Sequence, residues 1–309
     1  MEPGLAELVV NLHITERCNY SCSYCFGKWG IQGSDEVFQD RGSAVALISD
    51  VFDVCTTLGR DRADPPAIRF NFAGGEPALV PDLPAMIEFC RGLGARTSIV
   101  TNGLAVRRFD AQWLKHNVDI IGISIDSAAD RTNVRIGRAT RSGRPFDLAE
   151  IARAVADLRR AGHRAIKMNT VVSRENLAED FSDVLRALRP DRWKVMQMLP
   201  VYGSATAVSS AEFDAFLRRH SASEAIISSE NNEEMTSSYL MIDPMGRFFW
   251  TSEGSDGSDG SDGSHGSEGS AGNGYAHSRP IMESGAAAAL AECPISWDKY
   301  RARYRTEPL

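Results

Sequence analysis

The sequence predicts an α/β fold in which six β/α units form an incomplete parallel barrel, open on one side. Short apolar runs rich in β-branched residues alternate with longer amphipathic stretches, which is typical of repeated β/α units around a parallel sheet. Six such runs precede residue 201. A cysteine-rich loop follows the first run, at the end of the strand where parallel barrels carry their binding sites.

The apolar runs predict strands over residues 8–14, 67–73, 96–101, 120–125, 165–172 and 193–200. The amphipathic stretches predict helices over residues 42–59, 81–93, 108–116, 147–161, 175–188 and 211–220. Asp147 and Ser210 are expected N-caps, because a short polar side chain can accept from the free N–H groups of a first helical turn. Gly59 and Gly162 are expected helix ends, since glycine readily adopts the left-handed conformation found there.

The composition is that of a globular protein, with 43% hydrophobic and 24% charged residues in a chain of 309. The formal net charge is −7, but residues 251–278 hold five acidic residues and no Lys or Arg, which leaves about −2 for the remainder. This balance favours neither a nucleic-acid partner nor a membrane surface. No run of 18 apolar residues and no leader pattern is present. We therefore predict a cytoplasmic monomer without a membrane anchor.

A low-complexity tract divides the chain into two expected ordered parts. Residues 252–274 repeat glycine, serine and acidic residues, so they can bury almost nothing and are expected to form a flexible acidic loop. Calcium binding by the Asp residues is a second interpretation, although the EF-hand pattern is absent. Trp297, Tyr300 and Tyr304 are expected to anchor the C-terminal segment. The expected organisation is barrel, loop and C-terminal segment, over residues 1–250, 251–278 and 279–309.

Three cysteines lie together in the stretch Cys18-Asn-Tyr-Ser-Cys22-Ser-Tyr-Cys25-Phe26. Thiolates at spacings of four and three residues can reach three irons of a cubane cluster from one loop and leave the fourth iron open for a small molecule. A zinc knuckle and buried structural thiols are the alternatives. Zinc would want a fourth ligand nearby, and His13 is the only local histidine.

The other three cysteines, Cys55, Cys90 and Cys293, are isolated and do not suggest a disulfide framework. This usage fits a reducing compartment. Cys55 and Cys90 fall in predicted helices, where we expect them to be core residues.

A second motif, Asn71-Phe-Ala-Gly74-Gly75-Glu76-Pro77, ends the second predicted strand. Two adjacent glycines allow the backbone to approach a ligand closely, and a carboxylate can accept from an ammonium group. Such a turn suits an amino-acid moiety. Standing alone, it could equally be a simple Gly-Gly turn.

Together, the cysteine triplet and the Gly-Gly-Glu-Pro turn resemble the motifs of the radical S-adenosylmethionine (SAM) superfamily. The resemblance implies a partial (β/α)6 barrel of the radical SAM type with a C-terminal extension. It implies a [4Fe-4S] cluster on Cys18, Cys22 and Cys25, with SAM chelated to the open iron. The residues that it assigns to SAM are Tyr24, Gly74, Gly75, Glu76, Asn102 and Ser124. Taken singly, Asn102 and Ser124 could be a cap or a turn former.

Within that superfamily the chain resembles the microbial and fungal viperins, which dehydrate a nucleoside triphosphate. The matching stretches are residues 11–20, 131–138, 167–176, 192–197 and 238–243. The resemblance implies a substrate site of Asn11, Arg69, Arg138, Lys167, Asn169 and Lys194. The four cations are expected at or near the C-terminal ends of strands, where they could converge on a triphosphate. Individually, each could be a solvated surface charge. Arg69 replaces the more usual Lys of the family.

The viperin resemblance also implies a reaction. Reductive cleavage of SAM, with electrons from a flavodoxin or reductase, yields a radical that takes the ribose 4′ hydrogen of CTP or UTP. Loss of the 3′ hydroxyl as water, with one further electron and a proton, then gives the 3′-deoxy-3′,4′-didehydro nucleotide, an antiviral product. Tyr239 matches the family's active-site tyrosine, although it could simply pack at a strand end. The C-terminal segment would close over the nucleotide.

Three other classes of protein remain as alternatives. A different radical SAM enzyme could act on another phosphorylated substrate, and an iron-sulfur carrier or zinc regulator would have no catalysis. A carrier needs a fully ligated cluster, and no fourth cysteine lies near the triplet. Enzymes with an auxiliary cluster normally carry further C-terminal cysteines, and only Cys293 is present.

Overall fold

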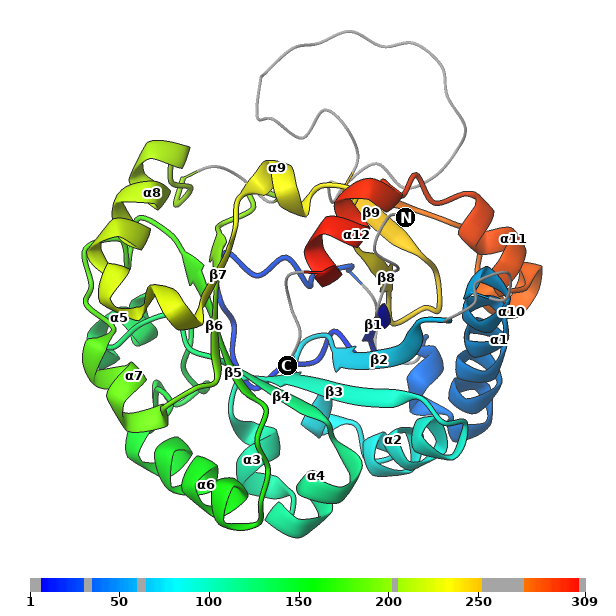
Figure 1. Cartoon of the computed structure of the whole chain (residues 1–309), viewed down its shortest axis with the longest axis horizontal. Helices are drawn as coiled ribbons and strands as arrows, with labels where there is room; N and C mark the ends of the chain where they lie inside the picture. The colour runs from blue at the N-terminus through cyan, green and yellow to red at the C-terminus, as the bar shows by residue number, and fades with distance from the viewer. Residues whose placement is uncertain (1–6, 31–34, 60–64, 202–204, 252–274, 306–309) are drawn as a thin grey trace, which may run out of the picture.

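The computed structural model describes residues 7–30, 35–59, 65–201, 205–251 and 275–305. Its main feature is a parallel sheet of eight strands in the order β7-β6-β5-β4-β3-β2-β1-β8. The sheet curls into an open barrel with most helices around its outside (Figure 1). The strands are β1 (Glu7–His13), β2 (Ala67–Ala73), β3 (Arg96–Thr101), β4 (Ile120–Ser124), β5 (Ile166–Val172), β6 (Arg192–Gln197), β7 (Ile227–Glu230) and β8 (Leu240–Ile242).

Helices α1 to α7 follow strands β1 to β5 along the chain, and the other described helices lie between or after the remaining strands. In chain order they are α1 (Arg41–Gly59), α2 (Leu83–Gly92), α3 (Leu104–Arg108), α4 (Ala111–Asn117), α5 (Asp130–Arg135), α6 (Leu148–Arg160), α7 (Ser182–Leu188), α8 (Ser210–Arg219), α9 (Asn232–Met235), α10 (Ile281–Ser284), α11 (Ala286–Ala291) and α12 (Trp297–Arg305). Among the described helices, none combines the length and the apolar character that crossing a membrane requires.

The structure confirms the predicted α/β class and its six β/α units. The predicted strands 67–73 and 96–101 match β2 and β3 at both ends. The predicted helix 108–116 has the wrong start. Asp110 accepts from the N–H groups of Gln112 and Trp113, so α4 begins only after Asp110, and the chain before it belongs to α3. Asp147 is an N-cap as predicted.

Two other helix starts differ from the prediction. The N-cap of α8 is Ser209, one residue before the predicted Ser210, and it forms a capping box with Glu212. Helix α7 begins at Ser182 and not near residue 175. The sequence pattern predicts that a helix exists better than it predicts where the helix starts or ends, because each end depends on one local hydrogen bond.

The core lies on both faces of the sheet. Side chains of β1 to β6 pack against the surrounding helices, and Phe72 and Trp193 are fully buried. Cys55 in α1 and Cys90 in α2 belong to this core, as predicted. Each large apolar side chain buried in this way stabilises the fold by about 1.5–3 kcal/mol.

The open edge of the barrel is covered by the C-terminal part of the chain (Figure 1). Strands β9 (Phe249–Thr251) and β10 (Tyr275–His277) form an antiparallel pair. The predicted acidic loop and its calcium alternative fall on residues 252–274, which lie outside the described residues. The range predicted as loop thus includes paired strand residues at both ends.

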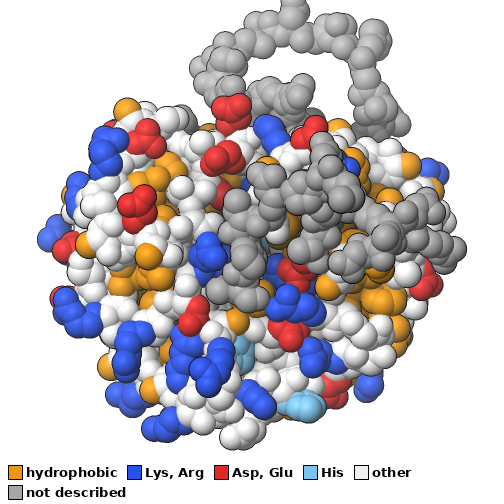
Figure 2. Space-filling view, in the orientation of Figure 1, with side chains coloured by type: hydrophobic (Ala, Val, Ile, Leu, Met, Phe, Trp, Pro, Cys, Tyr) orange, Lys and Arg blue, Asp and Glu red, His pale blue; other side chains and the backbone are white. Residues whose placement is uncertain are grey.

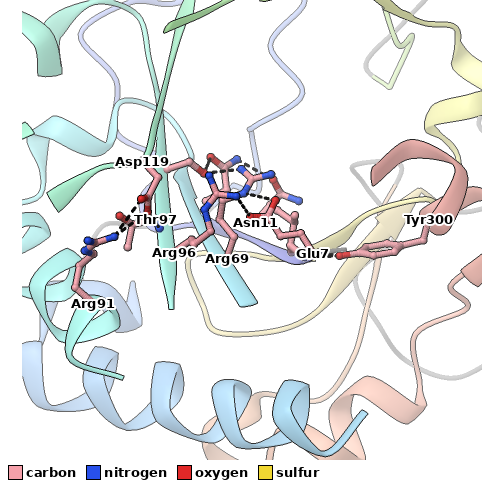
Figure 3. Close-up of polar contacts among 11 residues, drawn as sticks. Glu7, Asn11, Arg69, Arg91, Arg96, Thr97, Asp119 and Tyr300 are labelled. Carbon is pink, nitrogen blue, oxygen red and sulfur yellow. Dashed lines mark hydrogen bonds and ion pairs between the residues drawn. The ribbon is translucent and has the colours of Figure 1, made fainter. Parts of the chain in front are cut away.

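Helix α12 is held to the barrel by a buried tyrosine. The ladder between β1 and β8 starts at Val10, so the backbone of Val9 has no strand partner on that side. The Tyr300 hydroxyl takes its place: it accepts from Val9 N at 2.5 Å and donates to Val9 O at 2.9 Å (Figure 3). Tyr300 is fully buried, which agrees with its predicted anchoring role.

Candidate active site

A cavity of about 350 Å³ occupies the interior of the barrel. It is lined by strands β1 to β6 and β8 and by parts of the C-terminal segment. All the predicted site residues except Glu76 line it: Asn11, Cys18, Cys22, Tyr24, Cys25, Arg69, Gly74, Gly75, Asn102, Ser124, Arg138, Lys167, Asn169, Lys194 and Tyr239. The structure therefore brings together residues that lie more than 200 positions apart in the chain.

The cysteine loop follows β1 and packs against the segment after α5. Ser21 N donates to Gly137 O and Ser23 N donates to Ile136 O, both at 3.0 Å. Gly137 has a φ of +79°, and a Cβ there would lie 2.2 Å from Ser21 O. Only glycine permits this close approach, which fixes the loop over one end of the cavity.

The three thiols fit a cluster better than a single metal ion. Among the described residues, no three His, Cys, Asp or Glu side chains meet closely enough to hold one metal ion. Cys18, Cys22 and Cys25 nevertheless line the same cavity. A zinc ion needs its thiolates around one point, whereas each thiolate of a cubane cluster binds a different iron. Burial raises the pKa of all three thiols, so cluster binding must displace their protons.

The Gly-Gly turn after β2 packs directly under the cysteine loop. Gly75 N donates to Thr15 O at 2.7 Å, and Glu76 N donates to Arg17 O at 2.9 Å. A Cβ on Gly74 would lie 2.5 Å from Thr15 O, and one on Gly75 would lie 2.3 Å from Arg17 O. The two glycines are therefore needed to seat the turn against the loop that carries the thiols.

Glu76 lies behind the cavity wall and not on it. Its carboxylate accepts from the Thr101 hydroxyl at 2.8 Å and from the backbone N–H groups of Ala78 and Asn102 at 3.2 and 2.7 Å. Burial raises its pKa to about 7, against these hydrogen bonds, which lower it. The carboxylate ties the end of β2 to the end of β3. It holds Asn102, whose Nδ2 lies 3.7 Å from Cys18 Sγ.

Arg138 lies at the same end of the cavity as the cysteines. Its guanidinium is paired with Asp126 at 2.5 Å and donates to Ser124 O at 2.6 Å. Tyr24 donates to the same Asp126 carboxylate at 2.6 Å. Sequence reasoning did not single out Asp126, which joins two of the predicted site residues, Tyr24 and Arg138. Its position directly after β4 is the signal that could have identified it.

The other three cations lie deeper than predicted. Arg69 is the third residue of β2, Lys167 the second of β5 and Lys194 the third of β6. The prediction that they lie at C-terminal strand ends is wrong, because side chains in the first half of a strand also project into the barrel. They still line the same cavity. Figure 2 shows both acidic and basic side chains on the face seen down the barrel, with basic ones more frequent at the lower left.

Arg69 begins a chain of hydrogen bonds across the cavity wall (Figure 3). Arg69 is paired with Glu7 at 2.8 Å and donates to Ser98 Oγ at 2.9 Å. Ser98 donates to Asn71 Oδ1 at 2.7 Å, and Asn71 Nδ2 donates to Asn11 Oδ1 at 2.8 Å. A guanidinium can only donate, so the direction of every bond in this chain is fixed and the Asn11 amide has one orientation.

Asn169 carries an unsatisfied buried acceptor. Its Oδ1 atom is buried and has no hydrogen-bond partner among the described residues, and the side chain lines the cavity. A buried polar atom without a partner is costly unless a ligand or water meets it. Asn169 Oδ1 is thus suited to accept from a bound substrate.

Tyr239 lies in a buried cluster of charges. Lys194 Nζ lies 2.9 Å from the Tyr239 hydroxyl and 2.6 Å from Glu230. Tyr239 donates to Glu230, and Arg303 of α12 donates to the Tyr239 hydroxyl at 2.5 Å. Burial raises the pKa of Tyr239 well above its usual value. Burial alone would raise the Glu230 pKa, but Lys194 and Arg303 hold it below its usual value.

The fold and the site define a class. A parallel half-barrel that carries three cysteines after its first strand and a Gly-Gly-Glu-Pro turn after its second is the arrangement expected of a radical SAM protein. The profile of the Radical SAM superfamily matches residues 12–188.

Curated relatives are more specific. An S-adenosylmethionine-dependent nucleotide dehydratase from Psychrobacter lutiphocae is 35% identical over 98% of this chain and 96% of its own length. One from Pseudoalteromonas ulvae is 30% identical over 98% of this chain and 94% of its own length. The chain belongs to the radical SAM superfamily and, within it, to the family of the S-adenosylmethionine-dependent nucleotide dehydratases. Membership confirms the expected cofactors, a [4Fe-4S] cluster and SAM.

Solved structures support the fold alone. Streptococcus suis SuiB bound to S-adenosylmethionine superposes with a TM-score of 0.55 at 14% identity, over 79% of this chain and 60% of that one. The anSMEcpe structure with bound AdoMet gives a TM-score of 0.54 at 15% identity, over 79% of this chain and 73% of that one.

Proposed function

We propose that this enzyme removes the 4′ hydrogen of a pyrimidine nucleoside triphosphate, CTP or UTP, and eliminates water to form the 3′-deoxy-3′,4′-didehydro nucleotide. The observation that carries the proposal is the joint lining of one cavity. The thiols and the Gly-Gly turn lie at one end, and Arg69, Lys167 and Lys194 line the deeper part. SAM and a triphosphate would thus meet in one enclosed space.

At the cysteine end, Cys18, Cys22 and Cys25 would hold the cluster. The open backbone of Gly74 and Gly75 suits the amino-acid part of SAM, since no side chain stands between that backbone and the cavity. The remaining polar groups proposed for SAM are those of Tyr24, Asn102 and Ser124. Glu76 would act indirectly, by holding the Asn102 backbone.

Around the cavity wall as a whole, basic lining residues outnumber acidic ones among the described residues. Arg69, Arg138, Lys167 and Lys194 line the cavity, and Asp126 is the one carboxylate among its described lining residues. Charge-assisted hydrogen bonds from such groups are the strongest that a protein can offer a triphosphate. Asn169 and Asn11 add neutral polar contacts for the rest of the nucleotide.

When bound, the cluster and SAM supply a carbon radical that can remove one hydrogen atom from the ribose. The barrel interior then has to exclude water and deliver a proton to the departing 3′ hydroxyl. Tyr239 is the proposed proton carrier, because its side chain lines the cavity and its hydroxyl lies beside Lys194, a proposed phosphate ligand. A flavodoxin or reductase would supply the electrons.

A competition assay tests the proposal. Reconstituted enzyme is incubated without oxygen with SAM, dithionite and equal concentrations of CTP, UTP, GTP and ATP, and products are measured by mass spectrometry. We expect a pyrimidine to give the dominant didehydro product and to stimulate release of 5′-deoxyadenosine. A dominant GTP product would overturn the pyrimidine assignment. Release that no nucleotide changes would overturn the substrate class.

A further inference from the structure

Arg303 of helix α12 pairs with Glu230 and stacks on the ring of Tyr239. Its guanidinium carbon lies 3.7 Å from the centroid of the Tyr239 ring, and its Nη1 donates to the Tyr239 hydroxyl at 2.5 Å. The side chain is only 4% exposed. A stacked and hydrogen-bonded guanidinium of this kind fixes both the plane of the ring and the position of its oxygen.

We propose that Arg303 is a positioning residue that holds Tyr239 in the orientation needed for the dehydration, so that docking of α12 completes the active site. The inference rests on the proposed function, in which Tyr239 carries a proton. It goes further in assigning a role to a residue of the C-terminal helix, about 64 positions away from Tyr239 in the chain.

The hydrogen bonds around the phenol support this role. The Tyr239 oxygen has two lone pairs and one proton. Arg303 and Lys194 both lie within donor distance of the oxygen, and both can only donate. The phenol proton therefore points to Glu230, and Tyr239 can donate it to a bound substrate only by leaving this hydrogen bond. Without Arg303 one lone pair is free, and the hydroxyl can turn away from Glu230.

Arg303 is itself held firmly. Its Nη2 donates to Ser238 Oγ at 2.7 Å and to Glu234 O at 2.9 Å, and it forms an ion pair with Glu230. Three residues earlier in the same helix, the Tyr300 hydroxyl forms hydrogen bonds with the backbone of β1. The guanidinium thus bridges α12, the turn after α9 and Tyr239. A lysine could keep the charge but could not stack or form these parallel bonds.

The test combines Arg303→Lys with a matched control on the same helix. Arg301→Ala removes a guanidinium that is 43% exposed and paired only with Asp298 among the described contacts. We expect Arg303→Lys to lower kcat for the nucleotide about 10- to 150-fold, as for loss of one hydrogen bond to a charged group. KM and cluster content should stay within about twofold, as should all values for Arg301→Ala.

A double-mutant cycle separates positioning from general damage. Tyr239→Phe removes the hydroxyl, so Arg303→Lys should then lower kcat by less than about twofold. Unfolding in urea is measured for the same single and double variants. The double variant should shift the unfolding midpoint by less than the sum of the two single shifts. Guanidinium chloride at low concentration should partly restore kcat of Arg303→Ala.

Each result decides between distinct claims. Equal effects of Arg303→Lys with and without the Tyr239 hydroxyl, together with additive shifts in unfolding, would overturn the inference. Since the unfolding cycle needs no turnover, it tests the contact even if the wild-type enzyme proved inactive on every nucleotide. That last outcome would overturn the proposed function on separate evidence.

Discussion

Replacing Cys22 with alanine is expected to abolish cluster binding and SAM cleavage together. Each of the three thiolates binds its own iron, so no neighbouring side chain can take over a lost position. Cys22 lies between the other two in the loop that Gly137 and Ile136 hold over the cavity. Iron and sulfide content and the visible absorption of the reconstituted variant should fall to background, and 5′-deoxyadenosine should not form.

Cys293→Ala provides the control for this experiment. Cys293 is partly buried and packs against the core away from the cavity lining, so its loss should leave iron content and turnover unchanged. An absorption spectrum of Cys22→Ala identical to that of the unchanged protein would show that the cluster uses other ligands.

Removing the γ-phosphate from the nucleotide is expected to have the second largest effect. Arg69, Arg138 and Lys194 are buried in the barrel and Lys167 is half-buried, so a diphosphate would leave some of their charge-assisted bonds unmade. Each such bond contributes about 1.5–3 kcal/mol, so CDP should show a kcat/KM about 10- to 150-fold below that of CTP. Initial rates of 5′-deoxyadenosine release over a range of CDP and CTP concentrations provide the measurement.

Lys167→Gln tests whether the effect comes from the cations. Neutralising one cavity cation should lower kcat/KM for CTP more than for CDP. The ratio between the two values should therefore fall. Equal use of CDP and CTP by the unchanged enzyme would mean that the cationic lining serves another purpose, such as stabilising the barrel interior around Glu7 and Glu230.

Much of the fold could be predicted because buried parallel strands are continuous apolar runs. That signal is strong in β4, Ile120–Ser124, whereas β2 and β3 mix apolar and polar residues although their bounds were predicted without error. Strand β7, Ile227–Glu230, has three polar residues out of four and carries no such signal. It exists because β6 offers a free edge for pairing. Register and edges depend on tertiary contacts that local pattern does not contain.

The parts of the site that could be predicted are those in which the functional residues lie close together in the sequence, as a short motif. The cysteine triplet and the Gly-Gly turn need little more than their spacing. Glu230 and Arg303 lack any such signature. The sequence of α12 has several similar cations, and only the contact with Tyr239 distinguishes Arg303 from Arg301. The depth of Lys194 also depends on how the strands stagger around the barrel, which a linear pattern does not encode.

Above all, we propose that the cationic interior of the barrel presents the ribose of a nucleoside triphosphate to the SAM end of the same cavity. The most direct test uses CTP, or UTP if that is the better substrate, deuterated at the ribose 4′ position. Anaerobic turnover with SAM should place one deuterium in 5′-deoxyadenosine and yield an unlabelled didehydro nucleotide. Unlabelled 5′-deoxyadenosine from a substrate that is nonetheless consumed would contradict the claim.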